Sequence, residues 1–168
     1  MKKNLAVFVL YHSQYSQGKA IYSDIYKLLC RDANHPFEDG LDIPVYLRTG
    51  DDEQLRDISP INLDNTEKVF ILLLVDDKMY CSDVWHNYIG HIVKLQQEHA
   101  EQVLIMCVEL SKFSFDIGFG LSDKQFIRLN SYSIHDNWQE FQIRLFDNLI
   151  RFIKREAKIG RASCRERV

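Results

Sequence analysis

The segment KVFILLLVDDKMYCSDVWHNYIGHIV, residues 68–93, joins an apolar run to an amphipathic one. Residues 69–75 are all apolar, which is typical of a strand covered on both faces of a sheet. After Ser82, a plausible N-cap, apolar residues recur at helical spacing: Val84, Trp85, Tyr88, Ile89, Ile92 and Val93. A buried strand followed by an amphipathic helix is the unit from which parallel α/β sheets are built.

The rest of the chain repeats this alternation. Four further apolar runs of strand length occupy residues 5–11, 43–47, 102–110 and 125–129. A helical stripe follows the first run, at Ile21, Ile25, Leu28 and Leu29. A last helix is expected to start at Asn137, with Glu140 completing a capping box, and to bury Phe141, Leu145 and Leu149. Strands and helices in this order predict a five-stranded parallel sheet with helices on both faces, a flavodoxin-like α/β fold.

Two long connections interrupt the alternation, at residues 48–66 and 111–124. The first is polar, both contain glycine, and the second has little helical signal. Long loops within compact domains often have functions, so both are candidates for contact with a ligand or partner.

Composition excludes several classes of protein. A chain of 168 residues with 46% hydrophobic residues is long enough for one domain with a real core. The net charge of −3 argues against a nucleic-acid partner, which would require a basic face. No apolar run approaches the ~20 residues of a membrane span, and the N-terminus does not fit a secretory signal. Four cysteines without C-x-x-C spacing indicate reduced thiols in a cytoplasmic protein.

The last ten residues, IGRASCRERV (159–168), resemble the translation of a short-read sequencing adapter. The alternative is a basic tail formed by Arg161, Arg165 and Arg167. On the adapter interpretation, the domain covers residues 1–158, the tail is excluded from fold reasoning, and the natural chain continues past Lys158 into a missing C-terminal domain.

Ligands of open α/β sheets bind beyond the carboxyl ends of the strands, which directs attention to residues 11–17, 48–52, 76–82 and 111–115. A phosphorelay receiver would need an acidic pair where Tyr11, His12 and Ser13 stand. The segment HSQYSQGK (12–19) has neither the glycine spacing of a P-loop nor that of a flavin phosphate loop.

From Leu5 to about Lys158 the chain resembles a TIR (Toll/interleukin-1 receptor) domain of the bacterial type. AVFVLYHSQYSQGKAIYSDIYKLL (6–29) is similar to the first strand, loop and helix of that family, and IPVYLRTGDD (43–52) to the second strand and the following BB loop. KVFILLLVDDKMYCSDVW (68–85) keeps the family order of tyrosine, serine and tryptophan at Tyr80, Ser82 and Trp85, although Asp76 and Asp77 replace Ser-Pro. NWQEFQIRLFDNLIRFIK (137–154) corresponds to the last helix.

The resemblance implies cleavage of the nicotinamide–ribose bond of NAD+, with NAD+ as substrate and no resident cofactor. That reaction needs a carboxylate beside the ribose to stabilise the positive charge that develops as nicotinamide leaves. The family glutamate corresponds to Ile89, which has no charge and no hydrogen-bonding group and suits ordinary core packing. Weak substitutes are Asp76, Asp77 and Asp83, of which Asp83 faces away from Ile89 on the helix and one of the other two could simply cap the next turn.

The candidate nucleotide-binding residues match the family pattern better than the catalytic position does. Tyr11, Ser13 and Tyr15 follow the first strand, where the resemblance implies a loop that stacks on rings and contacts phosphates. Arg48 could pair with a phosphate or with nearby aspartates, and Trp85 could floor a pocket or lie in the core. His86 and His91 are five residues apart and do not share a helix face, so no metal site is expected.

Two functions follow as expectations. The first is a signalling or effector domain of a larger bacterial protein, with anti-phage defence as one context, that binds or cleaves an NAD-type nucleotide when a missing C-terminal sensor drives assembly. The alternative is a catalytically inactive interaction module that self-associates through TIR–TIR contacts. Burial of Ile89 without a nearby strand-end carboxylate favours the second, and a carboxylate beside Tyr11 and Tyr15 favours the first.

Overall fold

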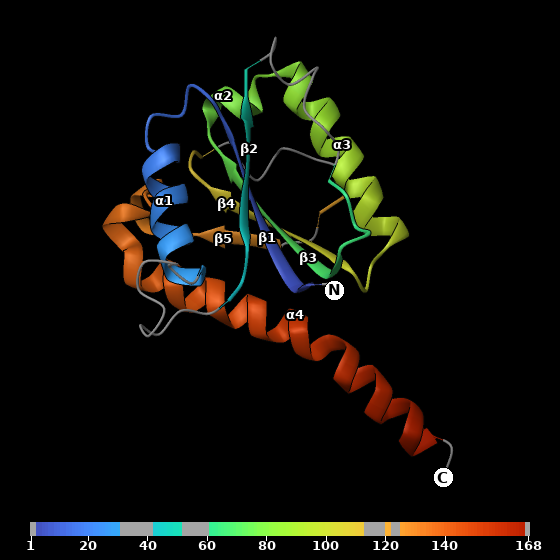
Figure 1. Ribbon diagram of the computed structural model, residues 1–168. Coiled ribbons are helices and arrows are strands. Elements are labelled where there is room, and N and C mark those ends of the chain that lie inside the picture. The colour runs from blue at the N-terminus through green and yellow to red at the C-terminus, as the bar shows by residue number, and fades with distance from the viewer. Residues whose placement is uncertain (1–2, 31–41, 52–60, 113–119, 122–124, 167–168) are drawn as a thin grey trace.

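The computed structural model describes residues 3–30, 42–51, 61–112, 120–121 and 125–166 (Figure 1). Five parallel strands form one sheet in the order β2-β1-β3-β4-β5. The strands are β1 (Lys3–His12), β2 (Val45–Gly50), β3 (Thr66–Val75), β4 (Val103–Glu109) and β5 (Phe126–Arg128). The predicted flavodoxin-like α/β fold is therefore confirmed.

Strand bounds differ from the expected ones mainly at the two edges of the sheet. β2 begins two residues later than expected and continues through Arg48 and Thr49 to Gly50, which the sequence had assigned to a loop. These residues pair with the end of β1, because Leu10 lies opposite Arg48 and His12 opposite Gly50. β5 is shorter than expected, with only three residues. Most of the predicted loop at 111–124 lies outside the described residues.

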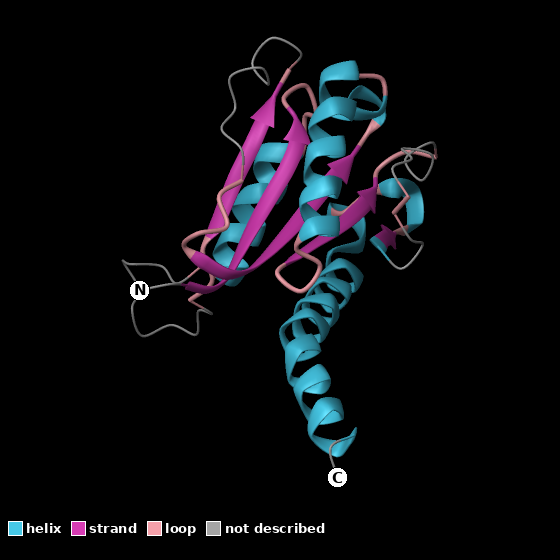
Figure 2. Cartoon of the chain, turned by 90° about the vertical axis from the view of Figure 1, so that its right-hand side faces the viewer, coloured by secondary structure: helices cyan, strands magenta, loops and turns pink. Residues whose placement is uncertain are grey.

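Helices cover both faces of the sheet, as Figure 2 shows. On one face lie α1 (Gly18–Leu29) and α4 (Trp138–Glu166), and on the other α2 (Asp77–Tyr80) and α3 (Asp83–Glu98). The residues that α1 and α4 bury against the sheet are Ile21, Ile25, Leu29, Phe141, Leu145, Leu149 and Phe152. Those of α2 and α3 are Met79, Trp85, Ile89, Ile92 and Val93. The apolar stripes read from the sequence are thus the two core-facing surfaces.

The two expected helix starts have different outcomes. Ser82 is the N-cap of α3, and its Oγ accepts a 3.2 Å hydrogen bond from the Trp85 backbone nitrogen, as predicted. The capping box at Asn137 is not found in its expected form. Asn137 instead donates through Nδ2 to the carbonyl oxygens of Asn130 and Ser133, and Glu140 pairs with Arg144 at 2.9 Å. Short 3₁₀ turns at Asn130–Tyr132 and His135–Asn137 precede α4.

Lys68 of β3 fastens α4 to the sheet. Its side chain is buried, and Nζ donates a 2.7 Å hydrogen bond to the Phe152 carbonyl oxygen and lies 4.9 Å from the centre of the Phe152 ring. In Figures 1 and 2 the C-terminal half of α4 extends past the strands. Because α4 ends at Glu166, it continues through most of the adapter-like residues 159–168.

The described helices contain no stretch with the length and apolar character needed to cross a bilayer. Three cysteines in the described part of the chain, Cys30, Cys81 and Cys107, are free thiols. Burial raises the pKa of Cys107 to about 12, so this thiol stays protonated and inert near neutral pH.

Candidate functional site

Several predicted site residues lie at the carboxyl edge of the sheet, where β1 ends at His12 and β3 at Val75. These strands are neighbours in register, so Asp76 follows β3 directly beside the end of β1. The His12 and Asp76 side chains are only 5% and 8% exposed. Titratable groups buried this deeply at the ligand-binding edge of an α/β sheet form the natural candidate site.

Asp76 caps the short helix α2. Its Oδ1 accepts a 3.0 Å hydrogen bond from the Met79 backbone nitrogen, as the capping interpretation predicted. Burial raises the pKa of Asp76, although that hydrogen bond and the neighbouring His12 both act in the opposite direction. Asp76 is therefore a buried carboxyl with a structural role, and Asp77 beside it is exposed.

Tyr15 and His12 accompany Asp76. Burial raises the pKa of Tyr15 to about 12, and the charge of Asp76 adds to this effect, so the phenol and the carboxyl are close enough to interact. His12 accepts a 3.1 Å hydrogen bond at Nδ1 from the Gln14 backbone nitrogen. His12, Tyr15 and Asp76 form the strand-end cluster.

His12 was not among the predicted site residues. A signal was available, because a histidine at the last position of an apolar strand reaches the ligand-binding edge of the sheet. Its burial could not be read from the sequence, since it depends on the packing of the loop that follows.

Tyr11 and Ser13 differ in exposure at this edge of the sheet. The Tyr11 ring is buried against the start of α1, and a Cβ added at Gly18 would lie 2.3 Å from Tyr11 Cδ2. Burial raises the pKa of the Tyr11 phenol. Ser13 is exposed, and its backbone nitrogen donates to the Gly50 carbonyl oxygen at 3.2 Å.

Trp85 and Ile89 belong to α3 and lie in the core between this helix and the sheet. Both side chains are 0% exposed, and the Trp85 Nε1 donates a 3.0 Å hydrogen bond to the Gly50 carbonyl oxygen. Ile89, one turn further along the helix, packs in the same apolar cluster against the sheet. Asp83 is exposed at the first position of α3. The core-packing interpretation of Trp85 and Ile89 therefore matches their positions.

The predicted nucleotide-binding residues are divided between the two faces of the sheet. Tyr11 and Tyr15 pack with the α1–α4 core, whereas Trp85 belongs to the α3 core. Arg48 lies on the α3 side, with its guanidinium carbon 5.3 Å from the centre of the Phe8 ring and Nη1 donating to the Leu47 carbonyl oxygen at 3.0 Å. The structure thus brings Tyr15 and Asp76 together, whereas Arg48 and Trp85 belong to the α3 side, from which the Trp85 indole reaches the Gly50 carbonyl oxygen beside the end of β1.

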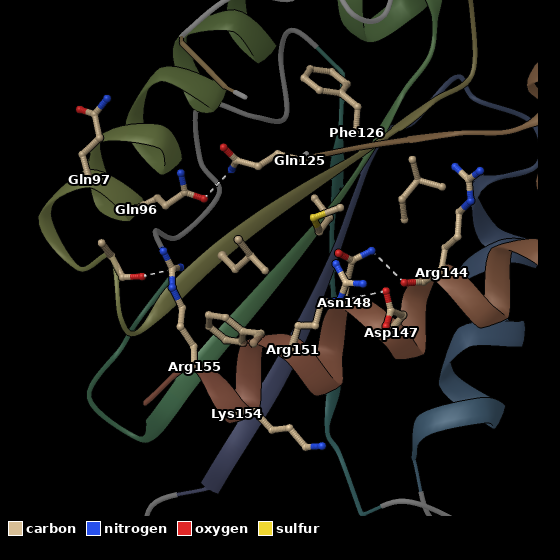
Figure 3. Close-up of a pocket in the computed structure, with 15 residues that line it drawn as sticks. Gln96, Gln97, Gln125, Phe126, Arg144, Asp147, Asn148, Arg151, Lys154 and Arg155 are labelled. Atoms are coloured by element: carbon tan, nitrogen blue, oxygen red, sulfur yellow. Dashed lines mark hydrogen bonds and ion pairs between the residues drawn. The ribbon is translucent and has the colours of Figure 1, made fainter. Parts of the chain in front are cut away.

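A second feature, which was not predicted from the sequence, is a groove of about 1030 Å³ between α4, the amino-terminal parts of β4 and β5, and the end of α3 (Figure 3). Its floor is apolar, and its rim contains amides and basic side chains. The floor residues are Leu104, Met106, Phe126, Ile127 and Phe152, and the rim residues include Gln96, Gln125, Arg144, Asn148, Arg151, Lys154 and Arg155. The available signal was the helical spacing of residues 144, 148, 151 and 155 beside the buried stripe of α4.

The cations of this groove are largely engaged by the protein itself. Arg144 pairs with Glu140 at 2.9 Å, Arg151 with Asp147 at 3.2 Å, and Arg155 donates to the Ala100 carbonyl oxygen at 3.4 Å. Their donors point to separate partners and do not converge on one point as an anion site requires. The groove is therefore a surface depression without an assigned ligand.

Among the residues that the structure describes, no three histidine, cysteine, aspartate or glutamate side chains gather as a metal-binding group. His86 contacts the Tyr80 carbonyl oxygen through Nε2, and His91 is exposed, in agreement with structural or solvated roles.

Comparisons with known proteins give no match. No protein-family model, no curated protein and no solved structure is significantly similar to the chain.

Proposed function

We propose that this chain is a TIR-like α/β domain that acts as an interaction module by self-association, without chemistry at its strand ends. The observation that supports this function is Ile89, the residue at the position of the family glutamate, which is 0% exposed within the α3 core. A buried isoleucine can neither stabilise positive charge on a ribose nor donate a hydrogen bond.

The polar groups around that position are used by the fold, which supports the same proposal. The Trp85 indole is bound to the Gly50 carbonyl, and the Asp76 carboxyl is bound to the first turn of α2. The single donor of the Trp85 indole and one oxygen of the Asp76 carboxyl are therefore engaged within the fold.

In this proposal the module belongs to a bacterial, cytoplasmic signalling protein, and a separate sensor triggers its assembly. The context of anti-phage defence comes from the family resemblance alone. A switch of this kind requires weak self-association that a sensor can strengthen, because linked modules meet at a high effective concentration.

The test is sedimentation velocity of the full chain over a wide concentration series. The proposal predicts a sedimentation coefficient that rises reversibly with protein concentration. A chain that sediments as a monomer throughout, even when fused to a dimeric carrier that imitates the sensor, would contradict it.

The second candidate function is binding or cleavage of an NAD-type nucleotide. It is favoured by one observation, the strand-end cluster of His12, Tyr15 and Asp76, in which a buried carboxyl with a raised pKa lies near an imidazole and a phenol. Raised carboxyl pKa values are common where an acid takes part in chemistry.

This candidate predicts that NAD+ contacts the strand-end cluster. Titration of the chain with NAD+, followed by NMR of the His12 and Tyr15 ring signals, would then give saturable shifts that Asp76→Asn weakens. Shifts confined to Arg144 and other groove residues would place a nucleotide elsewhere and count against the strand-end site.

A further inference from the structure

The exposed aliphatic side chains of the protein gather on one helix. Among the described residues, the large aliphatic side chains that are exposed are Ile143, Ile150 and Ile153, at 69%, 48% and 49%, and all three lie on α4. Large apolar side chains grouped on one surface usually mark a site of interaction.

The spacing of these residues is that of a coiled-coil seam. With Phe146, which is half-buried and also packs against the α1–α4 core, they are separated by three, four and three residues, which is the a/d pattern of a heptad repeat. The inner side of α4 is formed by Phe141, Leu145, Leu149 and Phe152, which are buried against the sheet. At 100° per residue, Ile150 points away from Phe141, so α4 has one apolar side for its own core and a second for a partner.

The position of α4 leaves this outer side accessible. Figures 1 and 2 show the helix along the margin of the domain, continuing past the strands. We call the four residues Ile143, Phe146, Ile150 and Ile153 the outer seam.

Charges beside the outer seam favour a second copy of the same helix in antiparallel orientation. One flank contains Glu140, Asp147 and Lys154, and the other contains Gln142, the buried Leu149 and, past the last seam residue, Glu156. Antiparallel pairing sets Ile143 opposite Ile153 of the partner subunit and Phe146 opposite Ile150 of the partner subunit. Glu140 then lies beside Lys154 of the partner subunit, and the twofold axis repeats this attractive pair, although Glu140 also pairs with Arg144 of its own helix at 2.9 Å.

Parallel pairing offers no such complement. In that orientation Asp147 would lie beside Gln142 of the partner subunit and Lys154 beside Leu149 of the partner subunit. In the antiparallel pair the two Asp147 side chains approach the twofold axis, but each already pairs with its own Arg151 at 3.2 Å, which reduces their repulsion.

We propose that the outer seam of α4 is an antiparallel homodimer interface, which supplies the self-association of the proposed function and rests on that function. Four seam residues from each copy bury much less than the roughly 800 Å² per partner of a standard stable interface. The dimer is therefore weak and concentration-dependent, as a module switched by local concentration requires.

The first test compares the full-length chain with Ile150→Asp by sedimentation velocity. The variant should remain monomeric at concentrations where the unmodified chain dimerises, and it should keep its thermal transition because Ile150 is outside the core. The matched control is Tyr26→Asp, which introduces the same charge at a comparably exposed apolar residue of α1 (45% exposed) and should dimerise normally.

The second test determines the orientation by charge reversal. Glu140→Lys and Lys154→Glu should each raise the dissociation constant about tenfold, because each converts two attractive pairs into repulsive ones. The double variant should recover most of the original affinity. Failure of the double variant to recover would overturn the antiparallel arrangement.

The outcomes separate this interface from the proposed function. Dimerisation that persists in Ile150→Asp would overturn the outer seam while self-association through another surface survives. Capture of an unrelated helix by a chain that stays monomeric on its own would overturn the homodimer and the proposed function together. If the chain dimerised through the outer seam and also cleaved NAD+, the interface would be supported, and only the claim that the strand ends perform no chemistry would be contradicted.

Discussion

The Trp85 indole nitrogen donates a 3.0 Å hydrogen bond to the carbonyl oxygen of Gly50, and this contact fastens α3 to the end of β2. The same carbonyl accepts a 3.2 Å hydrogen bond from the Ser13 backbone nitrogen. One carbonyl group thus joins α3, β2 and the loop after β1. The only hydrogen-bond donor of the Trp85 indole is therefore used within the fold, and we assign this residue a structural role.

Trp85→Phe should destabilise the domain by about 1–3 kcal/mol. The phenyl ring cannot donate the hydrogen bond to Gly50, and it leaves part of a fully buried volume unfilled. Urea denaturation measures the change. The control is Trp138→Phe, since Trp138 is half-buried and packs against Phe141 without an indole hydrogen bond among the described residues. Equal losses of unfolding free energy in the two variants would contradict a stabilising role of the hydrogen bond to Gly50.

Gly18→Ala should destabilise the domain by about 1–3 kcal/mol, because its Cβ would lie 2.3 Å from the buried Tyr11 ring. A smaller side chain at position 11 relieves the clash, so the penalty of Gly18→Ala should be smaller in a Tyr11→Leu background. A double-mutant cycle by thermal or urea unfolding measures this coupling. If the unfolding free-energy changes of the two substitutions were strictly additive, the start of α1 and the Tyr11 ring would not be in contact as described.

Asp76→Asn should become increasingly stabilising, relative to the natural residue, as pH rises. Burial raises the folded-state pKa of Asp76 above 3.8, so folding favours the protonated carboxyl. Below the unfolded-state pKa both states are protonated, and the contribution of Asp76 is complete. As pH rises through the folded-state pKa this contribution is lost, because the buried group must ionise. Urea denaturation of both proteins from about pH 4 to about pH 8 measures the difference. The opposite slope would show a lowered pKa.

The same substitution should lower the pKa of Tyr15 from about 12, because it removes the negative charge of Asp76. The value should stay above 10, since burial is the larger cause of the shift. NMR titration of the Tyr15 ring measures it. Asp77→Asn removes an exposed charge next in sequence and should leave Tyr15 unchanged. A similar decrease in both variants would contradict the specific proximity of Asp76 and Tyr15.

The fold could be predicted from the sequence because buried parallel strands and amphipathic helices have distinct patterns. β3 and α3 were located from residues 68–93 alone, with Ser82 as the N-cap. β2 was harder, since it lies at the edge of the sheet, where polar residues such as Arg48 are tolerated. Its extension to Gly50 depends on pairing with β1, which composition does not determine.

The candidate site was only partly predictable, because strand register decides which residues share a face. The sequence indicated which residues reach the carboxyl edge, including Tyr15 and Asp76. It could not indicate that Arg48, opposite Leu10, would lie on the α3 side while Tyr11 lies on the other. The outer seam of α4 was hidden for a related reason: Ile143 and Ile150 look like core residues until the inner side of the helix is known.

The most direct test of the central claim is nicotinamide release from NAD+ by the full chain, clustered on beads to impose assembly. The account predicts no release above that of the beads alone, although the same preparation self-associates. Release that Asp76→Asn abolishes and Asp77→Asn preserves would contradict it, and would show that the strand-end carboxyl performs the chemistry that Ile89 cannot.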